Sequence, residues 1–311
     1  MSSITTGFDD IVVTLYEGHY HLGVAALVNS LAKSDFKGLI NVGYKGALPP
    51  WISQLKVVDD ITYSLGSHTF IRFELLEIPI HFGYYKPVFI KKMFTDFSSV
   101  KRVYYFDPDI VINAPWSFFT DWVDSGVALC LDNSFPYVHE NHPWRMQWRA
   151  LSQTPQANFH RINFYVNSGF IGIKPKDYVL LDRWIDLTEN YRSTGGNLQM
   201  FEKDGHRSFK GDQDLLNAAI TISQEVILSI IGTEGMGFTF PAYLMTHAIG
   251  DIKPWKVNFF KELCVRGHRP DNAQKNYFNF CKAPINIFSK TTYSIKKTNL
   301  RFSALLGRLI G

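Results

Sequence analysis

The chain has 311 residues, of which 46% are hydrophobic and 19% charged, a composition that excludes a disordered protein and can bury a sizeable core. Its net charge of +4 is mild, and we expect no nucleic-acid partner. The three cysteines are too few and too scattered for a disulfide framework or zinc cluster, Met1 to Asp10 has no secretory signal pattern, and no apolar stretch reaches the roughly 18 residues of a membrane span.

The first part of the chain predicts alternating strands and helices. Asp10 to Leu15 is apolar and β-branched, Tyr20 to Ala32 has helical spacing, and Lys37 to Tyr44 is again strand-like. This order is typical of an α/β unit with a right-handed crossover. Ile71 to Ile80 is apolar but fits either a strand or a helix turn. Pro87 to Phe97 predicts a helix with Pro87 in its first turn.

The stretch from Val103 to Ile112 runs from apolar residues into Asp107-Pro108-Asp109 and back to apolar residues. Its start predicts a strand buried on both faces, as in a parallel sheet. Two carboxylates one residue apart converge only if a loop carries them, and Pro108 suits the end of a strand. Such a pair either holds a divalent cation or is a chance Asp-x-Asp in a turn.

The middle of the chain continues the α/β alternation around polar loops. In chain order we expect a strand over Val127 to Leu131 ending at Asp132, an irregular excursion over Phe135 to Arg161, a strand over Tyr165 to Ile173, a helix over Lys176 to Tyr191, a mobile loop over Ser193 to Lys210, and a helix from Asp212 to Ile222. A polar step, Asn167-Ser168-Gly169, interrupts the strand that ends at Ile173.

Four polar clusters lie beside apolar structure: Asp107-Pro108-Asp109, Asn167-Ser168-Gly169, Asp212-Gln213-Asp214, and the segment from His247 to Trp255. Ligands of open α/β sheets bind outside the carboxyl ends of strands, where three of these clusters are expected. Together they offer acid oxygens and an imidazole for a metal such as Mn²⁺, and a lysine for a phosphate. Taken singly, His247 also fits a core or capped histidine, and Lys253 a solvated side chain.

In this order the clusters resemble those of glycosyltransferase family 8. His247, Gly250, Lys253, Pro254 and Trp255 match every defined position of its His-x-x-Gly-x-x-Lys-Pro-Trp motif. Asn167-Ser168-Gly169 is similar to the family's Asn-Ala-Gly, and Asp212 to Asn217 to its Asp-Gln-Asp-x-x-Asn. The first strand departs from the family, because it runs into Thr14-Leu15-Tyr16-Glu17 and lacks the usual Asp- and Asn-bearing loop.

The resemblance implies an α/β fold: a single glycosyltransferase A-type, Rossmann-like nucleotide-sugar-binding domain with a mixed central sheet over residues 1–270, and a basic C-terminal segment over 271–311. It also implies a retaining glycosyltransferase that moves a hexose, galactose or glucose, from a UDP-sugar to a glycan or lipid-linked acceptor. By the same resemblance Asp107, Asp109 and His247 hold Mn²⁺ or Mg²⁺.

Other roles also follow from the resemblance. Lys253 and Gly250 would meet the β-phosphate of the donor, and Lys86 would be either a basic donor-binding residue or an ordinary surface lysine. The donor-sugar side would be formed by Asp132, Asn167, Ser168 and Asp212, and the base would meet Thr14 and Tyr16. Gln213 would stabilise the anomeric carbon during front-face substitution, while a covalent adduct on Gln213 or Asp214 is the alternative.

The C-terminal segment has a different composition. From Asn272 to Gly311 there are seven Lys or Arg and no Asp or Glu. Asn299 to Ile310 mixes leucines with two arginines, which favours attachment to an anionic membrane surface over a helix packed on the protein's own core. We expect a cytoplasmic protein, peripheral on the inner membrane, acting in bacterial surface polysaccharide synthesis, such as lipopolysaccharide or capsule.

Two rival functions remain open at this point. Asp107-Pro108-Asp109-Ile110-Val111 also fits a haloacid-dehalogenase-like phosphatase, with Asp107 as nucleophile and Asp109 as acid/base. That interpretation leaves the segment from His247 to Trp255 without a role. A non-catalytic nucleotide-sugar-binding protein is the other alternative.

Overall fold

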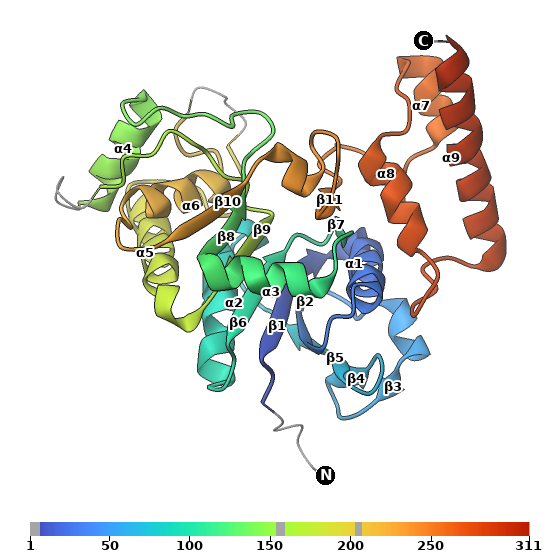
Figure 1. Cartoon of the computed structure of the whole chain (residues 1–311), viewed down its shortest axis with the longest axis horizontal. Helices are drawn as coiled ribbons and strands as arrows, with labels where there is room; N and C mark the ends of the chain where they lie inside the picture. The colour runs from blue at the N-terminus through green and yellow to red at the C-terminus, as the bar shows by residue number, and fades with distance from the viewer. Residues whose placement is uncertain (1–6, 154–158, 203–206, 311) are drawn as a thin grey trace.

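The computed structural model describes residues 7–153, 159–202 and 207–310, so the first six residues and parts of the expected excursion and mobile loop lie outside it. Its strands and helices alternate along the chain (Figure 1). The strands are β1 (Asp10–Glu17), β2 (Gly38–Lys45), β3 (Lys56–Val57), β4 (Thr62–Ser64), β5 (Thr69–Leu75), β6 (Arg102–Phe106), β7 (Ile110–Ile112), β8 (Val127–Cys130), β9 (Phe170–Ile173), β10 (Leu228–Ile231) and β11 (Met245–His247). The α-helices are α1 (His21–Lys33), α2 (Phe82–Asp96), α3 (Trp116–Ser125), α4 (Pro143–Ser152), α5 (Val179–Ser193), α6 (Asp212–Thr221), α7 (Phe259–Arg266), α8 (Asn272–Tyr277) and α9 (Lys290–Ile310).

Among the described residues, nine strands form one mixed sheet in the order β10-β8-β9-β6-β1-β2-β5-β4-β3. The central strands β6, β1, β2 and β5 run parallel, while β9 is antiparallel to both β6 and β8. A separate pair, β7 with β11, is antiparallel and lies next to the end of β6. The mixed α/β fold expected from the sequence is therefore confirmed.

The sheet is covered on both faces because its central strands are apolar on both sides. In β1, Val12 and Tyr16 pack into one core and Ile11 and Val13 into the other. Helices α1 and α3 cover the first face, and α2, α5 and α6 cover the second. Side chains alternate across a strand, so a continuous apolar run is what a three-layer arrangement requires.

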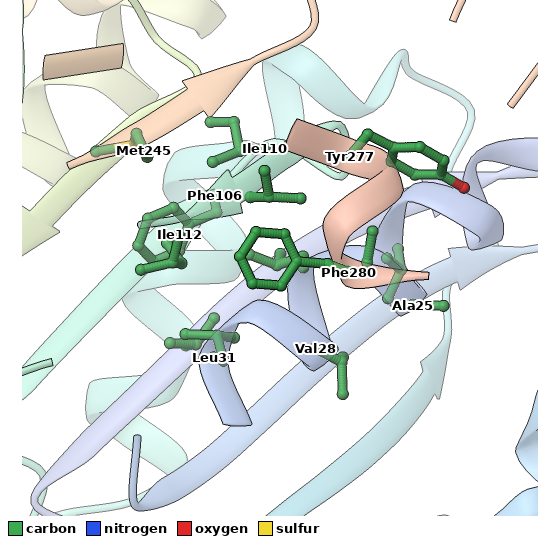
Figure 2. Packing of buried hydrophobic residues seen from close by; sticks show 14 of the residues in the cluster. Ala25, Val28, Leu31, Phe106, Ile110, Ile112, Met245, Tyr277 and Phe280 are labelled. Carbon is green, nitrogen blue, oxygen red and sulfur yellow. The ribbon is translucent and has the colours of Figure 1, made fainter. Parts of the chain in front are cut away.

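The C-terminal segment begins as part of the first core. Tyr277 and Phe280 pack against α1 and the β6–β7 region, beside Val28 and Ile110 (Figure 2). The Asn29 amide of α1 donates to the carbonyl oxygens of Phe280 and Ile285, at 2.7 and 2.8 Å. Helix α9 then runs along the outer edge of the molecule beside α7 (Figure 1).

Several sequence predictions need correction. Pro87 lies in the second turn of α2 and not in the first, because the helix begins at Phe82, and the same shift places Lys86 inside that helix. The excursion from Phe135 to Arg161 is not wholly irregular, since it contains α4, which buries Arg145 and Trp148. The ambiguous stretch from Ile71 to Ile80 contributes to β5, whose pairing with β2 decides its type.

Candidate active site

A turn and a strand pairing bring three potential metal ligands together. β6 ends at Phe106, and Asp107 is held there by its backbone N–H, which donates to the Gly169 carbonyl at 2.7 Å. The chain turns through Pro108 and Asp109 into β7, as the two carboxylates require in order to converge. β11 then pairs with β7 so that His247 lies opposite Ile110. Residues 140 positions apart in sequence are thereby placed at one site.

The ligand atoms of Asp107, Asp109 and His247 all lie within 4.8 Å of one another. The His247 Nε2 is 3.1 Å from Asp109 Oδ1 and 3.7 Å from Asp107 Oδ2. Two carboxylates and an imidazole are the donor set that suits Mn²⁺ or a similar divalent ion. The Asp109 and His247 side chains are buried, so the surrounding structure holds these metal donors in place, unlike carboxylates on an exposed acidic surface.

Lys253 neutralises Asp109, the more deeply buried of the two carboxylates of this triad. Its Nζ lies 2.8 Å from Asp109 Oδ2 and donates to the Ala248 carbonyl at 2.8 Å. Burial would raise the pKa of Asp109, but His247 and Lys253 outweigh burial and hold this pKa below its usual range. Lys253 is thus neither solvated nor remote, and it places a positive charge beside the triad.

Lys86 is a buried cation shared by two carboxylates. Its Nζ lies 3.1 Å from Asp107 Oδ1 and 2.8 Å from Asp212 Oδ2, and it donates to the Ser168 carbonyl and hydroxyl. Burial disfavours its charge, but Asp107 and Asp212 reverse this effect and raise the pKa of Lys86. The ordinary surface lysine considered from the sequence is therefore wrong, because α2 begins earlier than expected and buries this residue.

A second network joins Asp132 to the clusters Asn167-Ser168-Gly169 and Asp212-Gln213-Asp214. The Asn167 amide and the Gln213 amide both donate to Asp132 Oδ2, each at 3.0 Å. The Gln213 carbonyl oxygen accepts the Ser168 backbone N–H at 3.2 Å. Asp132, Asn167, Ser168 and Gln213 all line one cleft, so polar groups expected to contact a sugar lie together.

Asp214, in the first turn of α6, fixes the start of this helix by two hydrogen bonds. Its two carboxylate oxygens accept the Tyr165 hydroxyl and the Lys210 backbone N–H, both at 2.7 Å. Burial raises the pKa of Asp214 to about 6 despite these two donors. Because both oxygens are already bonded, the geometry favours a structural role for Asp214 over that of a nucleophile.

These residues line a cleft of about 730 Å³. Tyr16 and Glu17 form one side of it, and Tyr16 stacks on Tyr44 with ring centroids 5.8 Å apart. Thr14 is fully buried within β1, which continues two residues beyond the expected end, and it lies outside the cleft lining. Gly250 is exposed and is also absent from that lining.

One residue at the site, Tyr105, was missed in the sequence, and another, Gly169, was noted only as part of the Asn167-Ser168-Gly169 cluster. The Tyr105 hydroxyl donates to Asp107 Oδ1 at 2.7 Å, and the alternation of a strand, which puts residues two apart on one side, could have indicated this contact. Gly169 packs against the triad, where an added Cβ would lie 2.6 Å from His247 Cε1 and 2.9 Å from Asp107 Oδ2. Only the fold reveals that close approach.

No protein-family model and no curated protein matches the chain. Solved structures do. The apo structure of the bifunctional glycosyltransferase WbbM matches with a TM-score of 0.55 and 14% sequence identity. The match covers 97% of this chain and 53% of the WbbM chain, so this chain spans about half the length of WbbM. An active-site variant of LgtC, with glutamate in place of a glutamine, matches with a TM-score of 0.52 and 13% identity, over 90% and 98%. The chain therefore has the glycosyltransferase A-type fold expected from the sequence.

Proposed function

We propose that this chain is a retaining glycosyltransferase that moves a hexose, galactose or glucose, from a UDP-sugar to a saccharide or lipid-linked acceptor. The observation that carries this proposal is the convergence of Asp107, Asp109 and His247 at a cleft lined by Lys86, Lys253 and Gln213. The fold, shared with two glycosyltransferases, supports it.

Different residues of the cleft suit the metal, the phosphates, the base and the sugar of the donor. Asp107, Asp109 and His247 would hold Mn²⁺ or Mg²⁺, which when bound supplies Lewis-acid neutralisation of a diphosphate leaving group. Lys253 adds a positive charge beside the triad, suited to the same phosphates. Tyr16, the residue expected to meet the base, lines one side of the cleft but is only 2% exposed, so it would contact the base by its edge. Asp132 and Asn167 offer hydrogen-bond partners for sugar hydroxyls.

The transfer breaks the bond between the anomeric carbon and a diphosphate oxygen and forms one to the acceptor oxygen on the same face. The acceptor's proton passes to the departing diphosphate. Gln213 supports this route because its amide, fixed between Asp132 and Ser168, stabilises charge but is a poor nucleophile. Asp214 serves as the anchor of α6, and Asp212 keeps Lys86 charged in place.

A thermal-shift screen with UDP-galactose, UDP-glucose and GDP-mannose, each with and without Mn²⁺, tests the donor and the metal together. We expect stabilisation by one UDP-sugar that depends on the metal and is lost in His247→Ala. Release of UDP in the presence of saccharide acceptors then separates a transferase from a non-catalytic binding protein. Hydrolysis of generic phosphomonoesters without any donor effect would instead support the phosphatase alternative and overturn the proposal.

We further propose that α9 attaches the protein to an anionic membrane. The apolar strip of α9, defined as Ile295, Phe302, Leu305 and Leu309, recurs at spacings of seven, three and four residues, so its members lie on one side of the helix. All four side chains are exposed, and Arg301 and Arg308 are exposed beside them. In the described residues no helix is both long and apolar enough to cross a bilayer.

Removing residues beyond 270 would not test this idea cleanly, because Tyr277 and Phe280 belong to the core. The full chain carrying Phe302→Ser, Leu305→Ser and Leu309→Ser is the better variant, with Leu75→Ser, 52% exposed on β5, as control. We expect the triple variant alone to lose co-sedimentation with phosphatidylglycerol vesicles. Equal recovery of the triple variant and the wild type would contradict membrane attachment through this strip.

A further inference from the structure

A second hollow, of about 340 Å³, lies away from the cleft, between α8 and the chain that leads into β11. We call it the asparagine groove and define it by Asn113, Asn272, Asn276 and Asn279, with Phe240 and Tyr243 also lining it. Its volume falls within the range of roughly 300 to 1,000 Å³ typical of small-molecule sites. Neither the metal triad nor the proposed transfer uses any of these residues.

The two aromatic rings of the groove are unusually exposed. Phe240 is 85% and Tyr243 69% exposed, although both are large and apolar enough to be expected in a core. Both rings line the same hollow, whose other walls are mostly polar, and an exposed apolar patch with a polar rim is typical of an interaction site or a ligand groove. Their flat apolar faces suit the C–H face of a pyranose ring, as aromatic faces suit other flat apolar surfaces.

Two of the four amides of the groove, those of Asn113 and Asn276, are already fixed in place. The Asn276 Nδ2 donates to Asn113 Oδ1 at 2.5 Å and to Thr246 Oγ1 at 3.0 Å. The Asn113 Nδ2 in turn donates to the Ala242 carbonyl at 3.0 Å, which ties the aromatic-bearing segment to β7. A groove held by such a network loses little freedom when it binds a ligand.

The composition of the groove points to a neutral ligand rich in hydroxyls. A side-chain amide offers both a donor and an acceptor, as a sugar hydroxyl does, whereas carboxylates would favour a cation. The residues that line the groove, all of them described, include no Asp or Glu and one Lys, Lys275. One lysine among four amides is too little charge for a dedicated phosphate site.

The groove and the cleft lie on opposite sides of β11. Thr246 accepts the Asn276 amide in the groove, while His247, the next residue, faces Asp107 and Asp109. Successive side chains of a strand point to opposite faces, so a ligand in the groove does not enter the metal triad.

We propose that the asparagine groove is a second carbohydrate-binding site, which holds a neutral oligosaccharide by its amides and stacks it on Phe240 and Tyr243. This site goes beyond the proposed transferase activity, since binding there needs neither nucleotide nor metal.

Saturation-transfer difference NMR with the full chain tests this site, in the absence of nucleotide and metal. The probes are neutral tri- to hexasaccharides of galactose, glucose and N-acetylglucosamine. We expect one or more to bind, and Phe240→Ala with Tyr243→Ala to weaken that binding roughly tenfold, as loss of two stacking rings should. Phe118→Ala, an exposed phenylalanine on α3, is the matched control and should bind as the wild type does.

Two results would overturn the proposal: no binding by any of the probes, or equal binding by the wild type and the double variant. Sedimentation velocity adds a third, because self-association of the wild type that the double variant abolishes would make the rings a contact between copies. Both groove side chains are exposed, so the double variant should fold, and circular dichroism checks this. Because the experiment contains neither donor nor metal, a lack of sugar binding would not count against the proposed transferase activity. A lack of transferase activity would likewise not count against sugar binding in the groove.

Discussion

Replacing Lys86 by methionine should destabilise the protein severely, although the change keeps the length of the side chain. Lys86 is 5% exposed and lies 3.1 Å from Asp107 and 2.8 Å from Asp212. The substitution leaves the Asp212 carboxylate, 7% exposed, and the partly buried Asp107 without their cation. Removing one partner of a buried ion pair typically costs about 3 to 5 kcal/mol, because the remaining charge stays desolvated.

The assay is urea unfolding followed by tryptophan fluorescence at neutral pH. Lys91→Met, on the same helix, is the matched control, because Lys91 pairs with Asp182 at 2.5 Å but both side chains are more than one third exposed. We expect that exposed pair to contribute about 1 kcal/mol or less. A double-mutant cycle with Asp212→Asn should show that the two changes cost less together than their sum.

A loss of unfolding free energy in Lys86→Met no larger than that in Lys91→Met would contradict a stabilising buried ion pair at Lys86. Additivity in the cycle with Asp212→Asn would do the same, since the loss would then not arise from the ion pair.

Three further outcomes are expected. His247→Ala removes one of three metal donors and should lower Mn²⁺ affinity by about tenfold or more, measured by calorimetry; unchanged affinity would place the metal elsewhere. Gly169→Ala puts a Cβ 2.6 Å from His247 Cε1 and should cost about 1 to 3 kcal/mol, whereas Gly66→Ala, with open space around it, should be near neutral in the same urea titration. The pKa of Asp214 is raised to about 6, so the folded chain holds this proton more tightly than the unfolded one. Wild-type stability should therefore fall by about 3 kcal/mol from this group as pH rises from about 3 to 7. Asp214→Asn should remove that slope, and an identical pH profile of unfolding in the variant would show that another group is responsible.

The sequence alone determined the elements that have a strong local pattern. Apolar runs such as Asp10 to Leu15 and Val127 to Leu131 predicted the strands that β1 and β8 form, and the helix after β1 followed from its spacing. The family resemblance also identified the three residues that converge as potential metal ligands, because their order along the chain is part of the motif.

Tertiary structure decided what local pattern cannot encode. Lys86 is a buried double ion pair only because α2 begins at Phe82 and packs its second turn against the ends of β6 and α6. The C-terminal segment looked separate because it is basic, yet Tyr277 and Phe280 complete the core against α1. Composition is an average over a segment, whereas the burial of each residue is set by contacts between distant parts of the chain. In the same way, His247 reaches Asp109 only because β11 pairs with β7.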